Sequence, residues 1–331
     1  MIRKSIAEKP RGGRGPSYTR RVPRALRPVL IASLLLFLVF GDTPEPTRFW
    51  EALFDFGHAP LSGVVALLLR GWLAAGGWRA LRGRERASLL AFGLTVGIGA
   101  AVEALQNLQP NREPSWQDLW RDAAGAASFL LLREAWAAGG RPAGGRPSRA
   151  GRAAAVLAGL ALLLAAAATL ARTVRLYAER DRAMPTLFAL DGTWWERSLI
   201  DEGHSRLTPA PGLARLDLGA GEFPGVTFEE PYPDWRGYRS LVVRIVSDLD
   251  APLPMAIRVH DAAHNQRFED RFNRRLLVQP GENVFRIPLD EVRRAPRGRE
   301  MDLARVRGIL IFAPRLDRPT RVFLGPLRLE R

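Results

Sequence analysis

The sequence of 331 residues contains no cysteine and only four histidines. Without cysteine the chain forms no disulfide and uses no thiol in catalysis, and the absence is compatible with any compartment. The C-terminal half also lacks a Ser-His-Asp order, an HExxH metal motif and a glycine-rich phosphate loop. No enzyme class therefore follows from a motif, although a hydrolase that uses a pair of Asp or Glu side chains stays open.

The formal net charge is +15 at pH 7. In a soluble protein this excess would indicate nucleic-acid binding, so its distribution along the chain matters more than its size. Residues 183–331 hold 23 arginines against 21 acidic residues, a balance of +2, so the excess lies in the preceding part of the chain. We therefore expect no nucleic-acid partner.

Long uncharged runs are confined to the first half of the chain. The longest, residues 153–171, consists mainly of Ala and Leu. At about 1.5 Å per residue it approaches the ~30 Å thickness of the hydrocarbon layer of a bilayer. Shorter apolar stretches at residues 26–41, 57–78, 87–106 and 119–138 bring the expected number of transmembrane helices to five.

Basic residues alternate between the connections of these helices. Nine Lys and Arg precede the first helix, five lie in residues 70–86 and five in residues 133–152, whereas the other short connections hold only Arg48, or Arg112 and Arg121. By the positive-inside rule the N-terminus is cytoplasmic and the part after the fifth helix is outside. We expect a bacterial inner-membrane protein whose C-terminal domain is periplasmic or extracellular.

These boundaries divide the chain into six segments. The first, residues 1–25, is a basic cytoplasmic tail before a retained anchor, because no small-residue cleavage site follows the apolar run. The other segments are a four-helix membrane domain (residues 26–138), a cytoplasmic loop (139–152), a fifth transmembrane helix (153–172), a helical stalk (173–187) and an extracytoplasmic β-sandwich (188–331).

From about Leu187 the apolar residues recur with a period of two. In the stretch YRSLVVRIVS the residues Leu241, Val243 and Ile245 occupy alternate positions. Similar short runs bounded by Pro, Gly or Asp bring the expected number of strands to about eight in roughly 140 residues. The fold class is thus multidomain, an α-helical transmembrane bundle followed by an all-β jelly-roll sandwich.

The stretch RVHDAAHNQRFEDRFNR, residues 258–274, is the densest polar segment of the sandwich. Its planar amide, carboxylate and guanidinium groups suit the paired hydroxyls of a sugar, and aromatic rings could stack on a pyranose. The candidate glycan-binding residues are Trp235, Tyr238, His260, Asp261, Asn265, Asp270 and Arg271, with His264, Arg267, Phe268, Phe272 and Asn273 beside them. The alternative is a polar hairpin whose Asp and Asn satisfy the turn backbone and whose rings lie in the core.

The strand order, and the stretch DWRGYRSLVVRIVSD followed by this polar segment, resemble the galactose-binding-like jelly rolls of carbohydrate-binding modules over about residues 188–330. The resemblance implies a glycan ligand and permits a structural calcium, for which it assigns no ligands. No other cofactor is expected. Trp194 and Trp195 are expected in a strand, one ring facing the core and the other facing out.

In the membrane half, DFGHAPLSGVVALLL (residues 55–69), EALQ (103–106) and NREPSWQDLWRDAAG (111–125) follow one another. Together they resemble the VanZ-like family of small bacterial membrane proteins over about residues 28–138. The family is associated with teicoplanin resistance and the cell envelope, without a settled chemistry. The resemblance carries over Asp55, His58, Glu103, Gln106, Arg112, Asp118 and Gly125, while Asp122 stands where the family usually has Asn.

The expected topology places these residues together at the outer membrane face. Asp118, Asp122 and Gly125 share one face of a helix. We expect a polar pocket of Asp55, His58, Glu103, Gln106, Arg112, Asp118 and Asp122. In it, Arg112 would bind an anionic headgroup and His58 would exchange a proton. The alternative is a set of solvated interfacial residues, with Asp118 favoured by the helix N-terminus.

The expected function is glycan binding or scaffolding in envelope or exopolysaccharide biology, with membrane lipid as a second partner. Two alternatives stay open. One is a membrane enzyme that acts on a lipid-linked envelope precursor through the polar pocket, and its turnover would depend on the carboxylates. The other is a transporter or sensor component, which would need a continuous polar path across the membrane.

Overall fold

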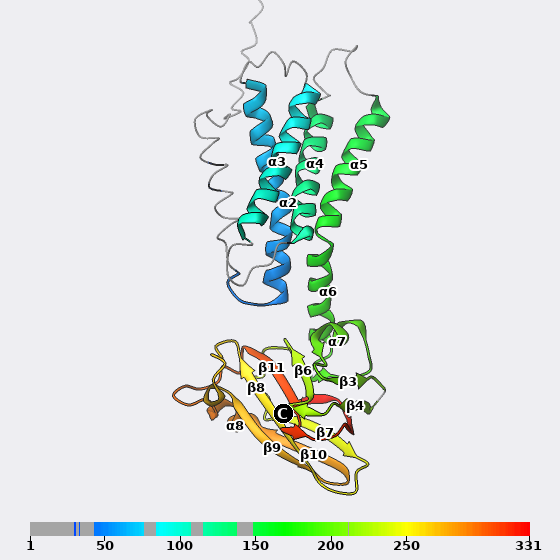
Figure 1. The fold of residues 1–331 in the computed structure, drawn as a ribbon, viewed down its shortest axis with the longest axis vertical. Helices are drawn as coiled ribbons and strands as arrows, with labels where there is room; N and C mark the ends of the chain where they lie inside the picture. Colours follow the sequence, from blue (N-terminus) through cyan, green and yellow to red (C-terminus); the bar gives the residue numbers. More distant parts are fainter. Residues whose placement is uncertain are drawn as a thin grey trace, which may run out of the picture. The chain divides into compact units, whose positions relative to one another are not determined.

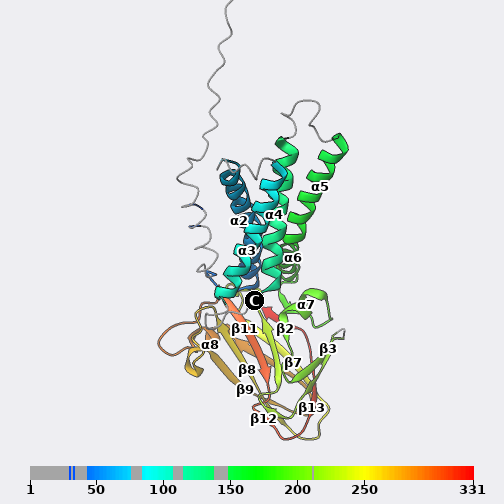
Figure 2. The same cartoon turned by 45° about the horizontal axis from the view of Figure 1, so that its top comes forward.

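A computed structural model describes residues 43–75, 84–106, 115–137, 148–210 and 212–331, together with Leu30 and Ser33. The described residues form two compact units. The boundary lies at residues 168 and 169, and residues 47–49 belong to the second unit (Figures 1 and 2). The predicted tail and the first predicted transmembrane helix lie outside the described residues, apart from Leu30 and Ser33.

The first unit consists of helices α2 (Arg48–Ala75), α3 (Arg84–Gln106), α4 (Trp116–Ala137) and α5 (Arg149–Ala166). Three stretches, Arg48–Ala75, Arg86–Leu105 and Arg149–Ala166, are long and apolar enough to cross a membrane. Helix α4 has the length but not the composition, because charged residues occupy its first two turns and its last turn. The described residues therefore support three of the predicted membrane helices by length and composition.

Small residues bring α4 close to its neighbours. A Cβ atom on Gly125 would lie 1.9 Å from the carbonyl oxygen of Ala59, so a larger residue would push α2 and α4 apart. On the α5 side, the Ser128 hydroxyl donates a hydrogen bond to the carbonyl of Gly159 at 2.7 Å. Because α2 and α4 touch at Gly125, polar side chains one turn away on the two helices come within hydrogen-bonding distance.

The second unit is a two-layer antiparallel β-sandwich (Figure 2). One sheet has the strand order β1-β14-β7-β13-β4-β3, with β10 also paired to β7. Its strands are β1 (Thr186–Phe188), β3 (Ser205–Thr208), β4 (Ala214–Leu218), β7 (Ser240–Ser247), β10 (Gly281–Pro288), β13 (Thr320–Leu324) and β14 (Leu327–Glu330).

The other sheet has the order β2-β6-β11-β8-β9, and a ribbon of β12 and β5 accompanies the two sheets. The strands are β2 (Ile200–Asp201), β5 (Gly221–Glu222), β6 (Gly225–Glu229), β8 (Leu253–Asp261), β9 (Phe272–Val278), β11 (Val306–Phe312) and β12 (Arg315–Leu316). The short helices α7 (Trp194–Leu199) and α8 (Leu289–Arg294) and the 3-10 turn Phe268–Asp270 lie between strands.

The all-β architecture predicted for this part of the chain is confirmed, and the alternation in β7 is the clearest case. Leu241, Val243 and Ile245 are fully buried between the sheets, because successive side chains of a strand point to opposite faces. The structure has more strands than the eight expected, since β1, β2, β3, β5, β12 and β14 are only two to four residues long and leave little or no periodic pattern in the sequence.

Two segments near the start of the sandwich differ from expectation. The segment predicted as a stalk is helix α6 (Ala168–Arg182), and its Leu176 is buried in the hydrophobic core of the sandwich. The Tyr177 hydroxyl donates to the carboxylate of Glu230. Trp194 and Trp195 lie in helix α7 rather than in a strand, with Trp195 buried. The sandwich unit thus begins at Thr169, 19 residues before the expected start of the sandwich at residue 188.

Candidate functional sites

The first candidate site joins α2 and α4 through a buried arginine. The guanidinium of Arg121 lies 3.0 Å from Asp55 Oδ2 and 2.5 Å from Asp118 Oδ1, and its side chain is 6% exposed. A buried guanidinium is tolerated where carboxylates compensate its charge. Arg121 is therefore the link between two predicted pocket residues, although the sequence interpretation did not include it; its signal was the i, i+3 spacing from Asp118.

The second part of this site surrounds Asp122. Its Oδ1 accepts a hydrogen bond from the Ser62 hydroxyl at 2.5 Å and lies 3.3 Å from His58 Nδ1. Its Oδ2 faces Gly99, where a Cβ atom would lie only 2.5 Å away. The glycine on α3 thus leaves space for the carboxylate. Asp122 is the acceptor that connects α2 to α4 and carries the charge that an Asn there would lack.

Glu103 completes this helix cluster, which we define as Asp55, His58, Ser62, Glu103, Asp118, Arg121 and Asp122. Glu103 is 8% exposed; one carboxylate oxygen accepts the backbone N–H of Ser115 at 2.9 Å, and the other is buried and has no hydrogen-bond partner among the residues that the structure describes. Five predicted pocket residues thus lie on the facing ends of three helices. Arg112 and the side chain of Gln106 lie outside the described residues.

The helix cluster is small and negatively charged. A cavity of about 10 Å³ lies among His58, Ser62, Val65, Thr95, Ile98, Gly99, Val102 and Asp122. That volume holds at most about one water molecule. The four carboxylates face a single guanidinium and one imidazole. Arg112, the residue predicted to bind an anionic headgroup, lies outside the described residues, so that part of the expected pocket stays a prediction.

The second candidate site lies in the sandwich, where two predicted glycan-binding residues turn out to be buried. The guanidinium of Arg299 forms two hydrogen bonds with Asp261, at 2.6 and 2.8 Å, and a third with Asp270 at 2.5 Å. Asp261 also accepts the backbone N–H of Asp302. Asp261 and Asp270 are only 1% and 7% exposed. The prediction that they bind a glycan is therefore wrong; they stabilise the fold through Arg299.

The electrostatics agree with a structural role for these carboxylates. The hydrogen bond from Arg299 lowers the pKa of Asp270 to about 2, against the opposing effect of burial. Burial also opposes ionisation of Asp261, but the hydrogen bonds from Arg299 and from the backbone of Asp302 lower its pKa. Because both carboxylates are taken by Arg299, neither is free to bind calcium. Among the described residues, no three His, Asp or Glu side chains converge on a metal position.

Polar residues next to this pair lie on the outer face of the five-stranded sheet. In β8, Met255, Ile257 and Val259 point into the core, so Arg258 and His260 point outward. Arg258 pairs with Asn273 on β9 and with Leu310 on β11. We define Arg258, His260, His264, Phe268, Arg271 and Asn273 as the face cluster.

Two histidines are held in defined positions within the face cluster. His264 Nδ1 lies 2.9 Å from the carbonyl of Asp270, and its Nε2 lies 3.0 Å from Arg258 Nη2. A carbonyl only accepts and a guanidinium only donates, so His264 carries its proton on Nδ1. His260 lies over Gly308, where a Cβ atom would be 2.5 Å from the ring. Burial, and then the charge of Arg258, lower the pKa of His260 to about 4.

The face cluster contains donors without partners. Nε of Arg258 and Nδ1 of His260 are buried and have no hydrogen-bond partner in the described structure. Burial lowers the pKa of Arg258 and also that of Arg271. Arg271 donates to Asn273 Oδ1 at 3.1 Å, and neither guanidinium forms an ion pair within the described residues. A buried polar nitrogen without a partner is costly, and both of these atoms are closed to solvent, so the groups of this cluster that a ligand could reach are the guanidinium ends of Arg258 and Arg271 and the ring of Phe268.

The exposed ring of the face cluster is Phe268. It is 63% exposed, and the Arg271 guanidinium lies 5.3 Å from its centre. Trp235 is fully buried, and its indole N–H donates to the carbonyl of Tyr232, so Trp235 is corrected from a stacking residue to a core residue. Tyr238 also packs against the core.

The other predicted residues of the polar segment have local roles. The Asn265 side chain accepts the backbone N–H of Arg267 at 3.0 Å, as expected for the hairpin interpretation. Phe272 is 5% exposed and belongs to the core. His260 and Arg271 are thus the predicted residues that the structure places beside Arg258 and Phe268.

No protein-family model and no curated protein sequence matches the chain, so the resemblance to the VanZ-like family is not supported. The β-sandwich is similar to a family 11 carbohydrate-binding module from Clostridium thermocellum in complex with a β-1,3-1,4-mixed-linked tetrasaccharide, with 10% identity over 40% of this chain and 82% of that chain and a TM-score of 0.31.

Two further solved structures show similar values. The family 11 module of a cellulosomal cellulase of Clostridium thermocellum has 13% identity over 44% of this chain and 92% of that chain, with a TM-score of 0.33. A family 29 carbohydrate-binding module complexed with cellulohexaose has 14% identity over 43% of this chain and 86% of that chain, with a TM-score of 0.30.

Proposed function

We propose that this chain is a membrane-anchored protein of the bacterial cell envelope that binds an acidic glycan through the face cluster of its β-sandwich. One observation carries the proposal. Two guanidiniums, Arg258 and Arg271, lie on the outer face of a sheet and form no ion pair among the described residues, beside the exposed ring of Phe268. A uronic acid supplies the carboxylate, the hydroxyls and the apolar ring face that these groups match.

The charge of the face cluster determines the class of glycan. His260 and His264 lie next to Arg258, and the face cluster itself contains no carboxylate. Because burial strengthens electrostatic interactions, a carboxylate between Arg258 and Arg271 would be stabilised more than a neutral hydroxyl. We expect weak binding, micromolar to millimolar, which corresponds to about −8 to −4 kcal/mol.

The test uses the full chain in nanodiscs of phosphatidylcholine. Polygalacturonate and a neutral mixed-linked β-glucan are titrated by isothermal calorimetry. We expect binding of polygalacturonate that weakens with added salt and with Phe268→Ala, while Arg239→Ala, which removes an exposed arginine from another part of the sandwich, has no effect. Equal affinity for both polymers would contradict the acidic class, and binding of neither would overturn the proposed function.

Orientation is part of the proposal, because an envelope glycan lies outside the cytoplasm. The three membrane-helix candidates of the described chain support attachment to a membrane. A reporter fused after Asp191 should read as external, and a reporter fused after Arg86 as cytoplasmic. A cytoplasmic reading after Asp191 would contradict the envelope location.

A second candidate function is acid–base chemistry on a lipid-linked envelope precursor at the helix cluster. It is favoured by the pair of His58 and Asp122 beside a cavity that holds about one water molecule. A carboxylate at Nδ1 orients an imidazole as a base for water. The negative charge of the helix cluster opposes an anionic substrate. Loss of an envelope phenotype in His58→Gln with unchanged thermal stability would favour this function; an unchanged phenotype would exclude it.

A further inference from the structure

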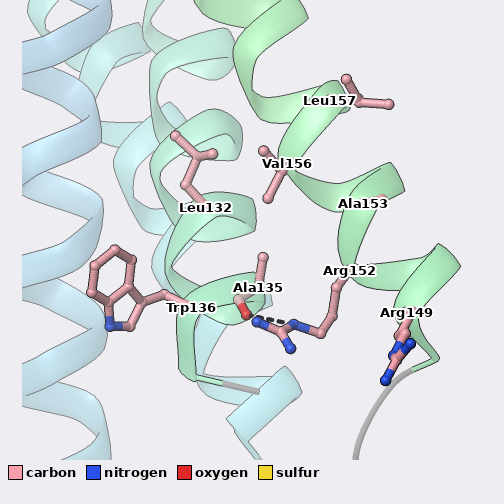
Figure 3. A pocket seen from close by; sticks show the side chains of 8 residues that line it. All are labelled: Leu132, Ala135, Trp136, Arg149, Arg152, Ala153, Val156 and Leu157. Carbon is pink, nitrogen blue, oxygen red and sulfur yellow. Dashed lines mark hydrogen bonds between the residues drawn. The ribbon is translucent and has the colours of Figure 1, made fainter. Parts of the chain in front are cut away.

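A groove of about 760 Å³ lies between α4 and α5 (Figure 3). It is formed by the last two turns of α4 and the first turns of α5. Its lining residues are Leu132, Ala135, Trp136, Arg149, Arg152, Ala153, Val156 and Leu157. The helices are in close contact at Ser128 and Gly159, two turns from Arg152, so the groove opens toward the end of the helix pair.

The walls of the groove are apolar and exposed. Trp136 is 87% exposed, Leu157 66% and Val156 37%. Leu160 and Leu164 extend the exposed apolar surface along α5 with helical spacing, about 10 Å beyond Leu157 at 1.5 Å per residue. Helix α5 is apolar enough to cross a membrane, so this surface suits an acyl chain.

The mouth of the groove is cationic. Arg149 and Arg152 lie one turn apart on α5, and the lining contains no acidic side chain. The Arg152 guanidinium donates to the carbonyl of Ala135 at 3.3 Å, which leaves other N–H groups available. In the described part of the chain Arg149 has no hydrogen-bonding or ionic partner. Two guanidiniums without a carboxylate match the geometry and charge of a phosphate diester.

We propose that this groove binds one anionic phospholipid. Its phosphate lies between Arg149 and Arg152, and one acyl chain follows Val156 and Leu157 along α5. Trp136 lies at the level of the headgroup, where indole rings are favoured. This site is separate from the face cluster, so it does not depend on the proposed glycan binding.

The test measures quenching of Trp136 fluorescence by lipids with brominated acyl chains. The full chain is placed in nanodiscs of phosphatidylcholine that contain either brominated phosphatidylglycerol or brominated phosphatidylcholine. The Trp136 signal is the difference between the wild type and Trp136→Phe. We expect phosphatidylglycerol to be preferred, with each arginine contributing about fivefold to the preference.

The variants distinguish a specific lipid-binding site from nonspecific attraction of anionic lipids to basic residues at the membrane surface. Arg149→Gln with Arg152→Gln should remove the preference, while Arg86→Gln should keep it, because Arg86 is an exposed arginine at the start of α3. Excess inorganic phosphate should not restore Trp136 fluorescence, since it offers no acyl chain. Equal quenching by both lipids in the wild type, a preference that survives the double substitution, or recovery with phosphate would overturn the proposal.

Discussion

The helix cluster and the face cluster are both polar and partly buried, but they differ in how their charges are compensated. In the helix cluster, Arg121 lies between Asp55 and Asp118, and Asp122 accepts from Ser62. In the face cluster, Arg258 and Arg271 have no carboxylate partner in the described residues. An arginine that is compensated by carboxylates stabilises the elements that carry it, whereas an uncompensated arginine would be stabilised by an anionic ligand.

The same contrast exists within the sandwich. Arg299 is held by two carboxylates, while the guanidinium of Arg258, near it in the fold, hydrogen-bonds to His264 and forms no ion pair among the described residues. The partners of an arginine therefore distinguish a structural position from a ligand-binding one. Residue type and proximity in the sequence do not make this distinction. Substitutions of Arg121, Arg299 and Arg258 test this distinction.

The largest expected effect is that of Arg121→Ala. It leaves Asp55 and Asp118 without a cation. Removal of one member of a buried ion pair costs about 3–5 kcal/mol in the free energy of unfolding, and because Asp55 and Asp118 are 38% and 19% exposed we expect the lower end of that range, about 3 kcal/mol. Thermal unfolding in detergent, followed by tryptophan fluorescence, measures the change. Arg239→Ala removes an exposed arginine of the sandwich and should melt like the wild type. If both variants melt together, the helix cluster is only a set of solvated side chains.

Arg299→Ala should have the next largest effect, about 2–3 kcal/mol, because it leaves two buried carboxylates without their charged donor. Circular dichroism of the sandwich in urea measures the loss. Arg239→Ala is the control, and an effect no larger than that of the control would contradict a structural role for Arg299.

The same variant has a defined pH dependence. The pKa of Asp270 is about 2 in the folded chain, mainly through Arg299, and about 3.9 in an unfolded chain. A depressed pKa contributes stability above pH about 4, and this contribution is lost as the pH falls toward about 2. The wild type should therefore lose stability in this window, and Arg299→Ala should lose less. Parallel curves would show that Arg299 does not set the pKa.

A smaller effect is expected from the N-terminal boundary of the sandwich. Residues 169–331 keep Leu176 in the core and Tyr177 bonded to Glu230, whereas residues 184–331 lack both. The shorter fragment should be less stable by about 2–3 kcal/mol, from one buried leucine and one hydrogen bond. Urea unfolding of the two fragments measures the difference. Equal midpoints would mean that α6 does not stabilise the sandwich and is only a stalk.

The smallest effect concerns pH and ligand binding. His260 has a pKa of about 4, lowered by burial and by Arg258, so it stays neutral between pH 5 and 8. Its pKa lies below the unfolded value of about 6.5, so its contribution to stability is present above pH 6.5 and decreases as the pH falls toward 4. Polygalacturonate affinity should be constant from pH 8 to 5. A change in affinity near pH 6.5 that persists in His264→Gln, which removes the other imidazole of the face cluster, would show that His260 titrates normally.

The sequence predicted the parts of this chain that depend on local periodicity. Alternation placed Leu241, Val243 and Ile245 in the core, and helical spacing placed Asp118 with Asp122. It did not predict the partners of buried charges. Arg299 meets Asp261 from 38 positions away, and no local pattern connects the two. The sequence interpretation counted Arg121 among the cations of a connection. Its burial could not be predicted, because it depends on the close approach of α2 to α4 at Gly125.

Aromatic residues were the least predictable part of the candidate site. Trp235 lies in a loop before β7, where no alternation indicates which way its ring points. The ring is buried in the core, where its indole N–H donates a hydrogen bond to the carbonyl of Tyr232. Phe268 stays exposed because the 3-10 turn Phe268–Asp270 buries Asp270 instead. Such choices depend on hydrogen bonds made by the folded chain.

The most direct test is the affinity of the Arg258→Ala, Arg271→Ala double variant for polygalacturonate, measured with the full chain alongside its thermal unfolding. If uncompensated guanidiniums bind the ligand, affinity falls at least about tenfold, since each charge-assisted hydrogen bond contributes about 1.5–3 kcal/mol, while thermal stability is unchanged or higher. Unchanged affinity together with a large loss of stability would contradict the account, because Arg258 and Arg271 would then be structural, like Arg121 and Arg299.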